Sequence, residues 1–155
     1  MTLTMTDPQL DLSLQFALKA ADMPRRADFR RWAKAALMVD ALVTLRVVDE
    51  DEGRDLNREY RGKDYATNVL TFAYGAAADG APLAGDIVIC APVVAREAAQ
   101  QHIAIAAHYA HLTLHGMLHL QGHDHETDAD ATAMEAIESF IMRRLGFDDP
   151  YAETT

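Results

Sequence analysis

Histidines in this chain are concentrated in one short segment. All seven lie within residues 102–125, and the densest part reads HGMLHLQGHDH. Positions four apart on a helix share one side, so His115 and His119 can present nitrogens to the same ion. Gly122 permits a sharp turn with positive φ, which can return His125 to that point. The spacing therefore predicts a metal site formed by these three imidazoles.

Three imidazoles with one open coordination position are typical of a catalytic zinc site, whereas structural zinc sites usually have four protein ligands, mostly cysteines. The chain contains a single cysteine, Cys90, so we expect one catalytic zinc ion per chain. Cys90 lies in an apolar run, and we expect it in the core. Imidazoles also accept nickel or cobalt, so the pattern leaves the identity of the divalent ion open.

The spacing also matches part of the metzincin protease motif, H-E-x-x-H-x-x-G-x-x-H. Gly116 stands where that motif has the glutamate that acts as general base in peptide hydrolysis. The zinc helix is therefore metzincin-like, but its sequence argues against a protease. A zinc peptidase that takes its carboxylate from another part of the chain remains an alternative.

Several polar residues near the three histidines have more than one interpretation. His108 and His111 share their helical face, so they can orient the ligands, contact substrate, or lie half-buried against backbone groups. Asp124 can hydrogen-bond a ligand imidazole or shape the loop. We expect His102 at a helix start or on the surface, and the sequence does not fix the direction of His123.

A second polar segment reads LNREYRGKD and places Arg61 close to Lys63. A guanidinium on a loop can hold phosphate oxygens through two hydrogen bonds, which suits an anionic ligand. The alternative is a surface ion pair, with Glu59 and Asp64 as the available partners. Combined with a zinc site, an arginine that holds phosphate would suffice for phosphodiester cleavage.

Hydrophobic periodicity predicts a single α+β domain over residues 1–155, with a four-stranded mixed sheet packed with about five helices. The expected strands cover residues 10–16, 42–49, 68–74 and 85–91, with a small-residue turn over 75–80. The expected helices cover residues 28–39, 51–64 (a short helix and a loop), 92–100, 103–121 and 128–145. Asp28 and Asp128 are the predicted caps of the first and last helices, and Gly122 ends the fourth.

Composition indicates a soluble, cytoplasmic protein with no membrane partner. The 155 residues contain no apolar run long enough to span a bilayer, and the first twelve lack the pattern of a secretory signal. The net charge of −10 argues against binding nucleic acid through bulk electrostatics. The charge is uneven, however: residues 19–34 carry six basic and two acidic side chains, and residues 121–155 carry nine acids and two arginines. A basic face could therefore still meet a polyanion.

The motifs resemble those of the YbeY family of bacterial endoribonucleases. HGMLHLQGHDH is similar to the family signature H-G-x-L-H-L-x-G-[Y/H]-D-H, and LNREYRGKDYATNVLTF to L-N-x-x-Y-R-G-K-x-x-P-T-N-V-L-S-F. GDIVIC and the closing LGFDDPY also match the family. Two positions depart from it: Ala66 replaces a proline and Thr71 a serine, changes that we expect to affect loop stiffness or one hydroxyl rather than the reaction.

The resemblance implies one zinc ion held by His115, His119 and His125, with Arg61 required for activity. It implies cleavage of single-stranded RNA in late 16S rRNA 3′-end maturation and a part in ribosome quality control. The implied partners are ribosomal RNA in the small ribosomal subunit, a small-subunit ribosomal protein and the Era GTPase. A non-catalytic ribosome assembly factor, in which the metal only rigidifies the turn between His115 and His125, is the second alternative.

Overall fold

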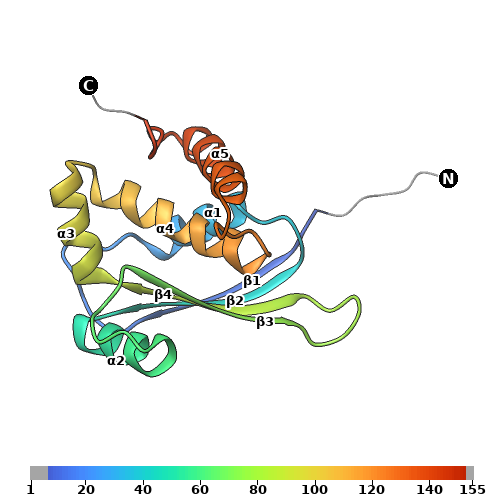
Figure 1. Ribbon diagram of the computed structural model, residues 1–155, viewed down its shortest axis with the longest axis horizontal. Coiled ribbons are helices and arrows are strands. Elements are labelled where there is room, and N and C mark those ends of the chain that lie inside the picture. The colour runs from blue at the N-terminus through green and yellow to red at the C-terminus, as the bar shows by residue number, and fades with distance from the viewer. Residues whose placement is uncertain (1–6, 153–155) are drawn as a thin grey trace.

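One twisted four-stranded sheet runs through the computed structural model, which describes residues 7–152 (Figure 1). The strands are β1 (Leu10–Phe16), β2 (Ala41–Val48), β3 (Val69–Ala76) and β4 (Leu83–Cys90). Their order is β1-β2-β4-β3, with β3 antiparallel to β4 and the other pairs parallel. The predicted mixed sheet is confirmed, and each strand boundary lies within two residues of its expected position. The prediction that the first twelve residues lack a secretory signal falls partly outside the described part, because residues 1–6 are not described.

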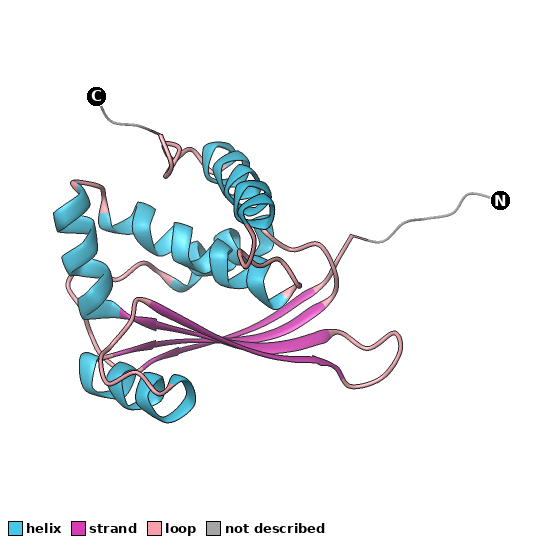
Figure 2. Cartoon of the chain, in the orientation of Figure 1, coloured by secondary structure: helices cyan, strands magenta, loops and turns pink. Residues whose placement is uncertain are grey.

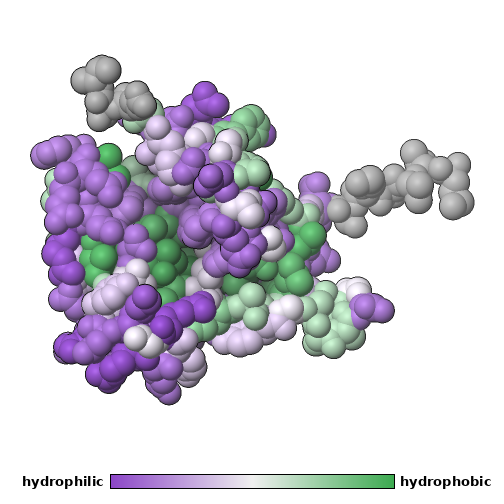
Figure 3. All heavy atoms as spheres, in the orientation of Figure 1, coloured by the Kyte–Doolittle hydropathy of each residue, from purple (hydrophilic) through white to green (hydrophobic). Residues whose placement is uncertain are grey.

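Five helices accompany this sheet, with α5 packed on α4, and the α+β class is confirmed. They are α1 (Arg26–Ala35), α2 (Glu50–Arg61), α3 (Ala91–Gln101), α4 (Ile105–Leu120) and α5 (Asp128–Arg144). Figure 2 shows α2 alone on one side of the sheet and the other helices on the opposite side. The outer surface of α2 is strongly hydrophilic in Figure 3, as its polar sequence requires. Within residues 7–152, none of the helices combines the length and apolarity that a bilayer crossing needs.

Both predicted aspartate caps are wrong, the first by three residues and the second by one. Arg25 precedes α1, and the Asp28 carboxylate accepts a hydrogen bond from the Arg25 backbone N–H at 3.0 Å. Asp28 thus occupies the third helical position, where a carboxylate satisfies the amide before the helix. The cap of α5 is the Thr127 hydroxyl rather than Asp128, because it accepts the N–H of Asp130 at 3.0 Å.

The C-terminus of α4 has the turn that the histidine spacing predicted. Gln121 is the C-cap residue of α4, and Gly122 follows it with φ of 98°. The N–H of His123 donates to the Leu118 carbonyl and that of Gly122 to the His119 carbonyl, each at 3.1 Å. This pair of bonds is a Schellman motif, which reverses the chain after the helix.

The larger core lies between the sheet and helices α1, α4 and α5. Phe29 contacts Trp32 and Tyr109 edge to face, with ring centroids 5.5 and 5.8 Å apart. On the α2 side, Cys90 is buried in a smaller cluster, which confirms its expected place in the core. Gly116 lets α4 approach the sheet closely, since a Cβ there would lie 3.1 Å from Ile87.

Arginines cover both free edges of the sheet. Arg26 and Arg30, from the basic segment 19–34, donate to the carbonyls of Leu14 and Leu12 on β1 at 3.1 and 3.0 Å. At the opposite edge, Arg61 donates to the Thr71 carbonyl of β3 at 2.7 Å. Unpaired strand carbonyls are thereby satisfied by charged side chains, which blocks edge-to-edge association. Part of the basic segment therefore has a structural role.

Candidate active site

The three histidines singled out by their spacing meet at the end of α4. His115 and His119 lie one turn apart on the helix, and the Schellman turn returns His125 beside them. The ring centroids are 6.3 Å apart for His115 and His119, 5.8 Å for His115 and His125, and 6.2 Å for His119 and His125. The structure therefore brings the predicted trio together.

Hydrogen bonds fix which nitrogen of two rings is available. The Nδ1 atom of His115 contacts the Glu138 carboxylate, and Nδ1 of His119 lies 3.1 Å from the His123 carbonyl oxygen. An ionised carboxylate and a carbonyl can only accept, so both Nδ1 atoms carry the proton. The Nε2 lone pair of each ring is left available, as in rings oriented for a metal by a second partner.

The donor set suits zinc, although the rings stand slightly too far apart in this structure. Within residues 7–152, no three His, Cys, Asp or Glu side chains already have the geometry of a metal site. Zinc–nitrogen bonds of about 2.0–2.1 Å in a tetrahedral site place imidazole centroids about 5 Å apart. The observed separations exceed this by about 1 Å, so the rings would move closer together to share one ion. The residue types and free Nε2 atoms therefore fit the expected ion.

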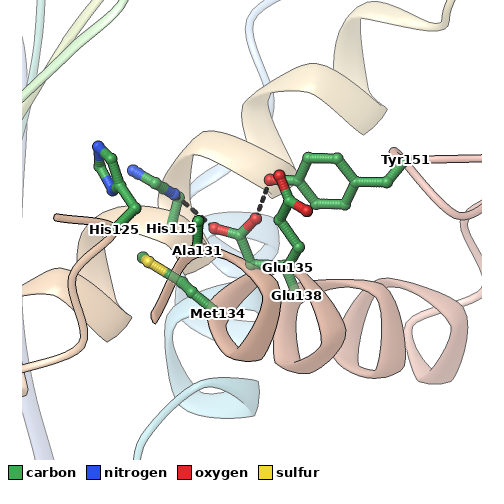
Figure 4. Close-up of a pocket in the computed structure, with 7 residues that line it drawn as sticks. All are labelled: His115, His125, Ala131, Met134, Glu135, Glu138 and Tyr151. Carbon is green, nitrogen blue, oxygen red and sulfur yellow. Dashed lines mark hydrogen bonds and ion pairs between the residues drawn. The ribbon is translucent and has the colours of Figure 1, made fainter. Parts of the chain in front are cut away.

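Glu138 on α5 is a site residue that the sequence reasoning missed. It is fully buried, and its carboxylate contacts His115 Nδ1 and the Tyr151 hydroxyl (Figure 4). It also lies 3.0 Å from His111 Nε2. Burial by itself raises the pKa of this carboxyl, but the hydrogen bonds from His111, His115 and Tyr151 outweigh it and lower the pKa to about 2. Glu138 is therefore ionised at neutral pH. Its signal in the sequence was an acid on the inward stripe between Met134 and Ile141.

Two cavities flank the histidines. The first, about 300 Å³, is lined by His115, His125, Ala131, Met134, Glu135, Glu138 and Tyr151 (Figure 4). The second, about 340 Å³, is lined by Arg61, Asn68, Val69, Leu70, Thr71, His115, His119 and His125. Acidic side chains line the first cavity, whereas none of the described residues lining the second is acidic. The histidines thus lie between an acidic hollow and a basic one.

Arg61 reaches the second cavity from the last turn of α2. Its guanidinium donates to the Thr71 carbonyl at 2.7 Å and lies 5.6 Å from the Phe72 ring centroid. Neither expected acidic partner pairs with it, and Asp64 instead forms ion pairs with Arg54. Among the described residues, no carboxylate neutralises Arg61, so its remaining N–H groups can meet an anion.

The other polar candidates have separate places. His111 shares the Glu138 carboxylate with His115, so it supports the histidine site through that acid. His108 is buried and lies 2.8 Å from Glu97 through Nε2, away from the trio. Glu97 also accepts a hydrogen bond from the Asn68 side-chain amide at 3.0 Å, and Asn68 lines the second cavity. His108 therefore supports Asn68 through Glu97. Sequence reasoning did not single out Asn68 or Glu97.

Of the remaining candidates, Lys63 and His102 are exposed and Asp124 and His123 are partly buried. Asp124 accepts the Glu126 N–H at 3.4 Å, a bond that shapes the loop. Lys63 is exposed and lines neither cavity. His102 ends α3 in a left-handed conformation with φ of 55°, so it is a surface residue at a helix end rather than at a helix start. His123 supplies its carbonyl to His119, and its ring contacts the Met38 sulfur at 3.4 Å.

Comparisons with known proteins agree with these motifs. The family described as Endoribonuclease YbeY matches residues 18–146, a span that includes Arg61 and all three histidines. The chain belongs to the YbeY family. It is 57% identical over 146 residues to "Endoribonuclease YbeY" of Methylobacillus flagellatus, covering 94% of this chain and 95% of that one. It is 58% identical over 150 residues to the protein of the same name from Laribacter hongkongensis, covering 93% and 90% of the two chains.

The fold is similar to that of a solved structure. The solution structure of TM1509 from Thermotoga maritima aligns with a TM-score of 0.55 and 21% sequence identity. The alignment covers 94% of this chain and all of the other. At this identity the likeness concerns the arrangement of helices and strands.

The contacts of Glu138 predict a measurable loss of stability in the Glu138→Gln variant. An amide cannot accept the three hydrogen bonds of the carboxylate, so we expect the free energy of unfolding to fall by about 1–3 kcal/mol at pH 7. The measurement is urea unfolding in the presence of a chelator. Glu135→Gln, on the same helix and exposed, is the matched control and should change stability by less than about 0.5 kcal/mol.

The difference between wild type and Glu138→Gln should also depend on pH. The folded-state pKa of about 2 lies below the ordinary value of 4.5, so the stabilisation is complete above pH 4.5 and is lost as the pH falls toward 2. We therefore expect the two unfolding curves to converge in acid. A constant difference between pH 6 and pH 3 would contradict the ionised state assigned to Glu138.

Proposed function

We propose that this protein is a zinc-dependent endoribonuclease that cleaves single-stranded RNA. The observation that carries the proposal is one cavity lined by three histidines and Arg61. Two of the histidines have their Nδ1 atoms engaged, which leaves Nε2 available to an ion. The relatives that share most of this sequence are named endoribonucleases, which supports RNA as the substrate.

His115, His119 and His125 would hold the ion, with Glu138 and the His123 carbonyl orienting two of the rings. A zinc ion with an open position supplies Lewis acidity and lowers the pKa of a bound water to about 7. The protein's own contribution is to fix the ring tautomers and to hold the site between two helices. His111 and Tyr151 complete the hydrogen bonds of Glu138, so this carboxylate stays ionised beside His115.

Arg61 would hold the scissile phosphate. Its bond to the Thr71 carbonyl and its contact with Phe72 fix the guanidinium, and its remaining N–H groups are free for phosphate oxygens. A guanidinium placed in advance stabilises the negative charge that grows on phosphate in the transition state. Glu135 and Glu138 in the first cavity repel an anion, which favours the Arg61 side for the phosphate.

In the cell, the proposal places cleavage in the cytoplasm, in late 16S rRNA 3′-end maturation and ribosome quality control. The proposed partners are ribosomal RNA within the small ribosomal subunit, a small-subunit ribosomal protein and the Era GTPase. Membership in the YbeY family supports this assignment.

The packing of Gly116 argues against a metzincin-type general base at this position. A Cβ here would lie 3.1 Å from Ile87, so the sheet leaves little room for a side chain. The nearest buried acid, Glu138, already accepts from three donors. Glu135, exposed in the first cavity with His115 and His125, is the carboxylate that the peptidase alternative would have to use as its base.

Removal of one imidazole tests the proposed function directly. We expect wild-type protein to bind about one zinc ion per chain and to cleave a small-subunit rRNA precursor. His119→Ala should lose most of the zinc and at least about 100-fold in cleavage rate. Metal analysis and a gel assay of RNA products measure the two effects.

His102→Ala is the control, because this exposed histidine ends α3 away from both cavities. It should bind zinc and cleave RNA like the wild type. A His119→Ala protein that cleaves RNA at the wild-type rate would refute the proposed function. A wild-type protein that binds zinc and the ribosome but never cleaves would indicate the assembly-factor alternative.

Arg61 should affect cleavage without affecting the metal. Arg61→Ala removes a charge-assisted hydrogen bond to the transition state, so we expect cleavage to slow by about 100- to 1,000-fold with zinc content unchanged. Arg61→Lys keeps the charge but not the two-pronged geometry and should recover only part of the rate. Single-turnover kinetics measure both, and an Arg61→Ala protein as fast as the wild type would exclude the assigned role.

A further inference from the structure

Aromatic side chains gather where the end of α2 meets β3. The rings of Tyr60 and Phe72 are 5.3 Å apart and pack edge to face. Tyr60 and Tyr74 are 59% and 66% exposed. We call Tyr60, Phe72 and Tyr74 the aromatic surface. Apolar side chains that form a continuous patch at the surface often mark interaction sites, so this cluster is a candidate binding surface.

The strand register and a hydrogen bond to Asp86 place Phe72 and Tyr74 on the α2 face of the sheet. Phe72 pairs with Asp86 of β4, and paired residues point to the same face. Tyr74 follows at a bulge, and its hydroxyl donates to the Asp86 carboxylate at 2.8 Å. That hydrogen bond returns the Tyr74 ring to the face of Phe72 and holds it there.

Arg61 connects the aromatic surface with the second cavity. Its guanidinium lines that cavity together with the three histidines, and it also lies 5.6 Å from the Phe72 ring centroid. It crosses the free edge of β3, where it donates to the Thr71 carbonyl. A phosphate held by Arg61 therefore has its neighbouring nucleotides close to the aromatic surface.

We propose that the aromatic surface is a subsite for the bases of single-stranded RNA. Bases stack on the exposed rings of Tyr60 and Tyr74 while Arg61 holds the adjoining phosphate. Stacking on an aromatic ring suits every base, because each has a flat π-face, and it needs no sequence-specific contact. The Asp86 carboxylate beside Tyr74 repels phosphates, so this end of the surface favours bases.

This inference rests on the proposed function and gives a physical reason for a preference for single-stranded over double-stranded RNA. The bases of a duplex are already stacked on one another, so they offer no free face to a tyrosine. Unpaired bases can leave their neighbours and stack on protein rings. The subsite therefore stabilises bound single strands and contributes little to a duplex.

Binding of a short single strand, measured without cleavage, tests the subsite. The probe is a fluorescein-labelled 2′-O-methyl RNA of about twelve nucleotides, titrated with zinc-loaded protein and followed by fluorescence anisotropy. We expect Tyr60→Ala and Tyr74→Ala each to raise the Kd by about 5- to 100-fold. Tyr60→Phe keeps the ring and should bind within about twofold of the wild type. A gel confirms that the probe stays intact, and thermal melting confirms that each variant folds.

Phe140→Ala is the matched control for loss of an exposed ring. Phe140 on α5 is 55% exposed and has the Arg144 guanidinium 5.6 Å from its centroid, the same arrangement as Phe72 and Arg61. Its removal should leave the Kd unchanged. A duplex of the same length should bind all variants equally.

The outcomes separate this inference from the proposed function. If Tyr60→Ala and Tyr74→Ala both bind the probe with the wild-type Kd while Arg61→Ala binds it more weakly, the subsite is overturned. The nuclease proposal is then left intact. A wild-type protein that neither binds the probe nor cleaves RNA would overturn the proposed function itself.

Discussion

The left-handed turn at Gly122 is the constraint on which the histidine site depends. Two imidazoles four residues apart on a helix can share an ion, but the third must come from outside the helix. Gly122 adopts φ of 98°, a conformation that strains residues with a Cβ, and the chain reverses within three residues. The backbone that makes this turn also supplies the His123 carbonyl that orients His119. One local structure therefore positions one ring and orients another.

A buried charge on a separate helix completes the site. Glu138 is the only fully buried carboxylate recorded within residues 7–152, and three hydrogen-bond donors surround it. A carboxylate in the core is costly unless fully paired, and a packed apolar side chain could replace it at similar or higher stability. Its presence beside His115 is better explained by orientation of that ring. The packing of α5 against α4 thus has a chemical role as well as a structural one.

The sequence was sufficient to predict the elements and the histidine trio, because both follow from local spacing. Helical periodicity placed His115 and His119 on one side, and the glycine implied the turn. The partners of Glu138 and of Asn68 could not be predicted, since they depend on which face of α5 meets α4 and on how α3 lies beside β3. Asp28 and Asp64 show the same limit: their types suggested a cap and a partner for Arg61, but nearby residues compete for both. Tertiary contacts decided the partners of Glu138 and Asn68, and competition among sequence neighbours decided those of Asp28 and Asp64.

Zinc K-edge X-ray absorption of the metal-loaded protein tests the central claim, that three imidazoles converge on one ion with a position left open. The account predicts three imidazole nitrogens and one further light atom at about 2.0–2.1 Å. A sulfur ligand at about 2.3 Å, or a spectrum that needs only one or two imidazoles, would contradict it.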